Sequence, residues 1–216
     1  MDNDQLGFAR QKIAGNIYFK LFVVLWFAGG VFLLFIKKGD VVFYINEIHT
    51  PFFDHFFKYV THLGDGVFYA VVTLALLLIN KKRAGYVALV GVVHGILIYF
   101  FKKVVFHMAP RPTKYFPDVD WNYVEGVTTH SFNSFPSGHT ASAFALMASL
   151  AIILDISKWV KVVFFCIALL VGLSRIYLLQ HFYVDTYAGA LVGTLCAMLI
   201  FVLLYKWLYA SEINNG

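Results

Sequence analysis

Residues 182–205 read FYVDTYAGALVGTLCAMLIFVLLY, an almost unbroken apolar stretch in which Asp185 is the one charged residue. A helix needs about 20 mostly apolar residues to cross a bilayer, because lipid cannot satisfy exposed backbone polar groups. This stretch is long enough to cross. It therefore predicts a transmembrane helix and decides the fold class.

Five further apolar runs precede it in the chain, at residues 21–36, 66–80, 84–101, 137–154 and 160–173. The composition agrees with a membrane protein, since 60% of the residues are hydrophobic and only 13% are charged, against roughly 25% charged in soluble domains. We predict an all-α, polytopic membrane protein, a bundle of six transmembrane helices that forms a single domain over residues 1–216. The first run is expected to stay as an anchor, because the mixed-charge residues before it do not resemble a cleaved signal peptide.

The formal net charge of +5 does not indicate a nucleic-acid partner, because the 17 Lys and Arg residues lie between apolar runs instead of on one solvated face. The two cysteines, Cys166 and Cys196, lie inside apolar runs, where free Cys is a small buried hydrophobe. We expect neither a disulfide nor a metal site from them. His49, His55 and His62 have spacings that match no standard zinc pattern.

The positions of the basic residues predict the orientation. Six crossings place both termini and the turns at 81–83 and 158–161 on one side, which holds more Lys and Arg than the other side once candidate site residues are set aside. By the positive-inside rule the termini are cytoplasmic. The long polar loop at residues 110–136 then lies outside, where loops of this length are usually functional or mobile.

Residues 41–60 are too polar to cross but have a helical pattern. Apolar side chains recur every three or four positions, at Val41, Ile45, Ile48, Phe52, Phe56 and Val60. We predict an amphipathic helix at the outer interface, interrupted or kinked near Pro51. Two roles are open: its apolar face borders the opening through which a lipid enters, or it only packs against the bundle.

Polar residues occur in three clusters, namely Lys103 with Arg111-Pro112, then Pro136-Ser137-Gly138-His139, and then Ser174-Arg175 with His181 and Asp185. Taken singly, each has an ordinary explanation: a Lys that anchors a helix end, a capped helix start, or a polar pair one turn apart. The topology, however, brings all three to the outer face. Ionisable residues at the edge of membrane helices are costly, and they indicate function.

The residue types suit phosphoryl transfer. His181 is the expected nucleophile, because Asp185 lies four residues later on a helix and can fix its tautomer. His139 is the expected general acid. Lys103, Arg111, Arg175 and the backbone amides of Ser137 and Gly138 would stabilise the phosphoryl charge. This chemistry needs no metal or cofactor, and neither an HExxH motif nor a Walker loop is present.

These clusters resemble the signature of the type 2 phosphatidic acid phosphatase superfamily, Lys-x6-Arg-Pro, Pro-Ser-Gly-His and Ser-Arg-x5-His-x3-Asp. The second and third motifs match without exception, so the resemblance covers residues 103–185. The first motif departs from the pattern, because seven residues separate Lys103 from Arg111. An extra helical residue rotates a side chain by about 100°. Lys103 therefore reaches the site if the helix ends before Ala109-Pro110 and irregular chain absorbs the extra residue; Lys102 is the alternative.

The resemblance implies a metal-independent lipid phosphatase or pyrophosphatase of the cell membrane that acts through phosphohistidine, with its site on the extracytoplasmic face and no obligate protein partner. Its substrates include undecaprenyl pyrophosphate, lipid A phosphate, phosphatidic acid and phosphatidylglycerol phosphate. The short chain with one long outer loop resembles bacterial members, which favours the first two.

Two alternatives belong to other classes. Vanadium haloperoxidases share the three motifs, but they are soluble, and the apolar runs argue against them. A non-catalytic phospholipid-binding or transport protein would need the cations but not His139, His181 and Asp185.

Overall fold

The computed structural model describes residues 3–213, and it describes side chains for residues 6–209. Within that range the chain is helical and contains no strand, which confirms the all-α prediction. In chain order the elements are α1 (Asn3–Ala14), α2 (Ile17–Leu33), α3 (Asp40–Glu47), α4 (Pro51–Val60), the 3₁₀ turn η1 (Thr61–Gly64), α5 (Gly66–Ile79), α6 (Lys81–Phe100), the π-helical turn η2 (Phe101–Val105), α7 (Pro112–Tyr115), α8 (Gly138–Ile153), α9 (Lys158–Tyr177) and α10 (Tyr183–Ile213).

Side-chain caps set the starts of the long helices. Asn16 caps α2, Asp65 caps α5, Asn80 caps α6 and Ser157 caps α9, each by accepting a hydrogen bond from a backbone amide of the first turn. Such caps satisfy amides that have no partner within the helix. Each of the six apolar runs forms a helix, with bounds within about four residues of those expected, except that α10 continues to Ile213, eight residues beyond the expected end.

The number of helices that can cross a membrane differs from the number of apolar helices. Within the described part of the chain, three helical segments are long and apolar enough to cross a bilayer, namely Lys81–Val105, Lys158–Tyr177 and Tyr183–Tyr209. The number rises to five if the bent pairs of α1 with α2 and of α4–η1 with α5 each count as one span. The 16-residue α8 is shorter. Six crossings remain a prediction.

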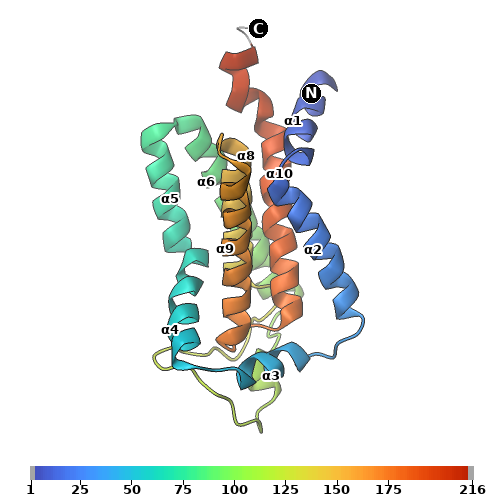
Figure 1. The fold of residues 1–216 in the computed structure, drawn as a ribbon, viewed down its shortest axis with the longest axis vertical. Coiled ribbons are helices and arrows are strands. Elements are labelled where there is room, and N and C mark those ends of the chain that lie inside the picture. Colours follow the sequence, from blue (N-terminus) through green and yellow to red (C-terminus); the bar gives the residue numbers. More distant parts are fainter. Residues whose placement is uncertain (1–2, 214–216) are drawn as a thin grey trace.

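Helix α8 lies at the centre of the bundle, against α6, α9 and α10 (Figure 1). Most of its side chains are buried, on every face of the helix. Gly189 and Gly193 of α10 permit the close approach of α8, because a Cβ at these positions would lie 2.5 Å from the Ser137 carbonyl and 2.2 Å from the Ala141 carbonyl. Glycines four residues apart are a common way to pack membrane helices closely.

The predicted amphipathic segment is two helices. The break falls just before Pro51, as expected, with Thr50 as the N-cap of α4. The apolar positions named from the sequence differ in burial: Ile45 is 7% exposed, whereas Ile48 and Phe52 are 46% and 71% exposed. Helices α3 and α4 both pack against α9, and the part of the apolar face in lipid entry stays a prediction.

The two ends of the bundle differ. Helix α1 and the C-terminal turns of α10 lie at one end (Figure 1). Helix α3 and the long loop between α7 and α8 lie at the opposite end, where α6 and α9 finish and α8 and α10 begin. This end holds the three sequence clusters.

Candidate active site

The long loop between α6 and α8 is held in place around Arg111. The Arg111 amide donates to the Ser131 carbonyl at 2.9 Å, and the Ser134 amide donates to the Ala109 carbonyl at 3.0 Å, so the loop doubles back on itself. The guanidinium donates through Nη1 to the Gln180 carbonyl at 2.9 Å and to its Oε1 at 2.8 Å, and through Nε to the Phe132 carbonyl at 3.0 Å. Gln180, which sequence reasoning missed, therefore holds Arg111.

Arg175 enters the site from the last turn of α9. Its side chain is buried, and Nη1 donates to the hydroxyl of Thr61 on η1 at 2.6 Å. Its Nε is buried without a partner. Nothing in the sequence pattern pointed to Thr61.

Lys102, and not Lys103, accompanies the two arginines. Lys102 is partly buried and interacts electrostatically with Arg111 and Arg175, whereas Lys103 is exposed. The π-helical turn at Phe101–Val105, closed by a hydrogen bond from the Phe106 amide to the Phe101 carbonyl, shifts the side-chain register at the end of α6. This shift in register accommodates the extra residue between Lys103 and Arg111.

His181 follows a tight turn at the end of α9. Leu179 adopts a left-handed conformation with a φ of 56°. The amides of Gln180 and His181 then both donate to the Arg175 carbonyl, at 2.9 and 3.1 Å. This turn places the imidazole of His181, which is 1% exposed, beside Arg111 and Arg175.

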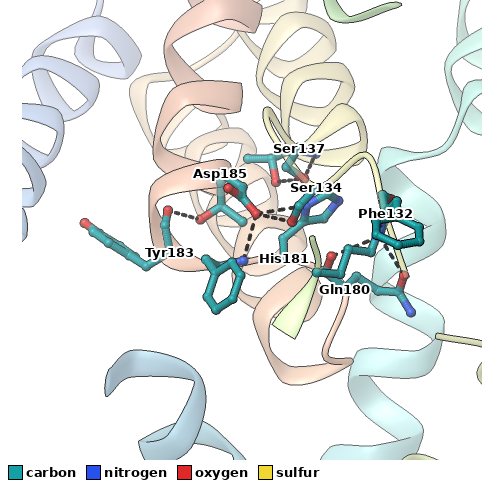
Figure 2. A network of polar contacts seen from close by, with 11 residues as sticks. Phe132, Ser134, Ser137, Gln180, His181, Tyr183 and Asp185 are labelled. Carbon is teal, nitrogen blue, oxygen red and sulfur yellow. Dashed lines mark hydrogen bonds and ion pairs between the residues drawn. The ribbon is translucent and has the colours of Figure 1, made fainter. Parts of the chain in front are cut away.

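Asp185 lies next to His181 but is bonded to other groups (Figure 2). Its Oδ2 is 3.4 Å from Nδ1 of His181, yet Nδ1 is buried without a hydrogen bond. The same oxygen accepts from the Ser134 hydroxyl at 2.5 Å and from the Phe182 amide at 2.9 Å. Ser134, buried in the loop before α8, is a further residue that the motifs did not indicate.

Ser137, Gly138 and His139 form the start of α8. The Ser137 hydroxyl accepts from the Thr140 hydroxyl at 2.9 Å, and the Ser137 amide donates to the Asp185 carbonyl at 2.9 Å. The Ser137 amide is therefore engaged with protein instead of being available to a ligand, contrary to the expectation for that group. A Cβ at Gly138 would lie 4.0 Å from Nζ of Lys102, which puts the Gly138 backbone beside the cations.

The site has a strong excess of positive charge. Burial holds the pKa of His181 well below its ordinary value, and the charges of Arg111, Lys102 and Arg175 lower it further. Burial and the same three cations also lower the pKa of His130 in the long loop. Within residues 6–209, none of these cations has a carboxylate oxygen within 4.0 Å. The charge of Asp185 acts on Arg111 and Lys102 but does not balance three cations. The arrangement is a neutral imidazole in an excess of positive charge, which favours the binding of an anion.

The chain resembles known proteins in sequence and in fold. The sequence model of the PAP2 superfamily matches residues 82–209. Lipid phosphate phosphatase 1 of Arabidopsis thaliana is 34% identical over 128 residues, which cover 48% of this chain and 39% of that protein. Lipid A 4'-phosphatase of Bacteroides thetaiotaomicron is 26% identical over 77% of this chain and 76% of its own length. The crystal structure of LpxE from Aquifex aeolicus superposes with a TM-score of 0.67 at 28% identity, covering 76% of this chain and 94% of that one.

Proposed function

Because the chain belongs to the PAP2 superfamily, we propose that it hydrolyses a lipid phosphate or lipid pyrophosphate through a phosphohistidine intermediate. One observation carries the proposal: Lys102, Arg111 and Arg175 surround the neutral, buried His181, and no carboxylate pairs with them among the described side chains. Holding two buried arginines and a partly buried lysine close together is costly unless a ligand supplies further negative charge. A phosphoryl group does so, and Arg offers it paired donors.

The reaction has two steps. Nε2 of His181 attacks phosphorus, the bond from phosphorus to the leaving oxygen breaks, and His139 donates a proton to that oxygen. His139 then takes a proton from water as the water oxygen attacks phosphorus, and the phosphorus–nitrogen bond breaks to release phosphate. Asp185 fixes the proton on Nδ1, so that Nε2 keeps its lone pair. The 3.4 Å approach is longer than a good hydrogen bond, and such bonds often tighten only when substrate is bound.

An apolar groove beside the site supports a lipid substrate. It has a volume of about 770 Å³ and lies between α2, α3, α9 and α10. Its wall includes Thr140, Ile176 and Thr186, which directly follow His139, Arg175 and Asp185 in the chain. Among the described residues that line it, Asp40 is the only charged one. A head group at the cations would therefore leave its hydrocarbon chain against this groove.

The proposed substrate is lipid A phosphate or undecaprenyl pyrophosphate, with phosphatidic acid and phosphatidylglycerol phosphate as alternatives. The similarity to Lipid A 4'-phosphatase, which extends over most of both chains, supports the first. The proposed location is the cell membrane, with cytoplasmic termini and the site on the extracytoplasmic face. The distribution of basic residues supports that orientation.

The test is phosphate release by the purified full chain in detergent, with EDTA present, from each of these four lipids and from a water-soluble phosphate ester. We expect release from at least one lipid, faster than from the soluble ester, and none from the His181→Ala variant. Binding of a lipid phosphate without release would favour a carrier. Loss of activity with EDTA that a divalent ion restores would contradict the metal-independent mechanism.

A further inference from the structure

The 3₁₀ turn η1 connects the two arms of a bent helix pair and lies against the proposed site. α4 and α5 meet at an angle of 54° across this turn. The turn precedes residues 82–209, so it lies outside the part of the chain that the family match covers. None of the three motifs includes it.

The turn packs closely against α8, which carries His139, and against α9, which carries Arg175. A Cβ at Gly64 would lie 2.5 Å from the side chain of Val171 on α9 and 2.6 Å from the carbonyl oxygen of His139 on α8. Gly64 is the last residue of the turn, and Thr61 is the first. The position of Thr61 is therefore tied to the backbone that carries His139.

Among the described residues, Thr61 is the one hydrogen-bond partner of the Arg175 side chain. Its Oγ1 accepts from Nη1 of Arg175 at 2.6 Å, and both side chains are buried, at 7% and 8% exposure. Nε of Arg175 is buried without a partner. An arginine side chain has many rotamers, and its planar fork binds a phosphoryl group well only when its orientation is fixed.

We propose that Thr61 is a positioning residue for Arg175: it holds Nη1 from the side of η1 and leaves Nε to donate to an oxygen of the transferred phosphoryl group. This inference rests on the proposed function of the same site. It also gives the α4–η1–α5 segment a part in catalysis in addition to any part in lipid entry. If Thr61 only filled space, a residue of the same shape without a hydroxyl group would replace it without effect.

The test compares Thr61→Val, which keeps the shape and removes the acceptor, with Thr61→Ser, which keeps the hydroxyl. Orthovanadate affinity of the full chain in detergent is measured by calorimetry, together with kcat/KM. Hydrogen bonds to charged groups contribute enough for a loss of about 10- to 100-fold. We expect Thr61→Val to weaken vanadate binding and lower kcat/KM within that range, and Thr61→Ser to stay near the unmodified protein.

Thr73→Val is the matched control, because Thr73 on α5 only donates from its hydroxyl to the Tyr69 carbonyl. We expect this variant to bind vanadate normally. If Thr61→Val does not fold, Thr61→Ala removes the same hydroxyl without adding a methyl group in its place. The second measurement is a double-mutant cycle: Thr61→Val should have no added effect on vanadate affinity once Arg175 is replaced by Gln.

Unchanged vanadate affinity in Thr61→Val, equal losses in Thr61→Ser and Thr61→Val, or additive losses in the cycle would each overturn the positioning role. The positioning role of Thr61 and the proposed function can fail independently in these experiments. If the unmodified protein releases phosphate from no lipid, the proposed function fails, while vanadate affinity still reports on the pairing of Thr61 with Arg175.

Discussion

Asp185 lies 3.4 Å from the imidazole of His181, but its nearer oxygen accepts its hydrogen bonds from Ser134 and from the backbone of Phe182. The carboxylate is thus positioned from two directions, while Nδ1 of His181 lies near it without a hydrogen bond. Ser134 is thereby placed to fix where the carboxylate points. This relationship links the loop before α8 to the nucleophile.

Ser134→Ala should lower kcat by about tenfold while the protein still folds, because the carboxylate loses one of its two anchoring donors. Steady-state kinetics on a lipid phosphate measure the effect. Ser131→Ala is the control, since Ser131 is exposed on the same loop and contributes its carbonyl to Arg111. Equal activity in both variants would show that Ser134 does not orient Asp185.

Substitutions of the two histidines should block different steps of the reaction. His181→Ala should lose turnover by about 10³-fold or more and form no phosphoenzyme. His139→Ala should still be phosphorylated by an aryl phosphate, whose leaving group needs no proton, but it should hydrolyse the intermediate slowly. Radiolabelled phosphate that is stable to base and labile to acid would identify phosphohistidine. Labelling of His181→Ala would contradict the assignment of the nucleophile.

Lys102 and Lys103 form an adjacent matched pair. Lys102→Gln should lower kcat/KM by about 10- to 100-fold, because one cation is removed from the phosphoryl site, whereas Lys103→Gln should change it less than twofold. Both are assayed on the same lipid phosphate at fixed salt. A larger loss in Lys103→Gln would mean that the π-helical turn does not set the register of the working enzyme.

The apolar groove should matter only to lipid substrates. Leu173→Trp places a larger side chain in its wall, so it should raise KM for a long-chain lipid phosphate several-fold and leave a water-soluble ester unaffected. Leu203→Trp is the control, because Leu203 is also exposed on a helix but does not line the groove. Equal effects of Leu173→Trp on the two substrates would remove the groove from substrate binding.

Gly193→Ala should destabilise the bundle, because the new methyl group meets the Ala141 carbonyl of α8. Overpacking of this kind costs about 1–3 kcal/mol, which lowers Tm by about 2–10 °C for a chain of this size. Gly95→Ala is the control, since nothing lies within 4 Å of a Cβ there. The measurement is thermal unfolding in detergent. A Tm in Gly193→Ala as high as in Gly95→Ala would show that α8 and α10 can separate without cost.

Local patterns in the sequence were enough to predict the helical class, the six apolar helices and the break before Pro51. Those features depend on hydrophobicity, caps and proline geometry within a few neighbouring residues. The motif residues His139, Arg175, His181 and Asp185 could also be named from spacing alone, because they lie on helix ends that the topology brings together. Their catalytic roles remain predictions.

The tertiary structure decided which side chains reach one another. Lys102 lies near Arg111 and Arg175 whereas Lys103 is exposed, and the π-helical turn that contains both lysines is not predicted by the geometry of an ideal helix. Thr61, Ser134 and Gln180 hold Arg175, Asp185 and Arg111 across distant parts of the chain, where no periodic pattern connects them. Hydrophobic periodicity specifies which face of a helix is buried, but the partners of a buried polar group depend on how the helices pack.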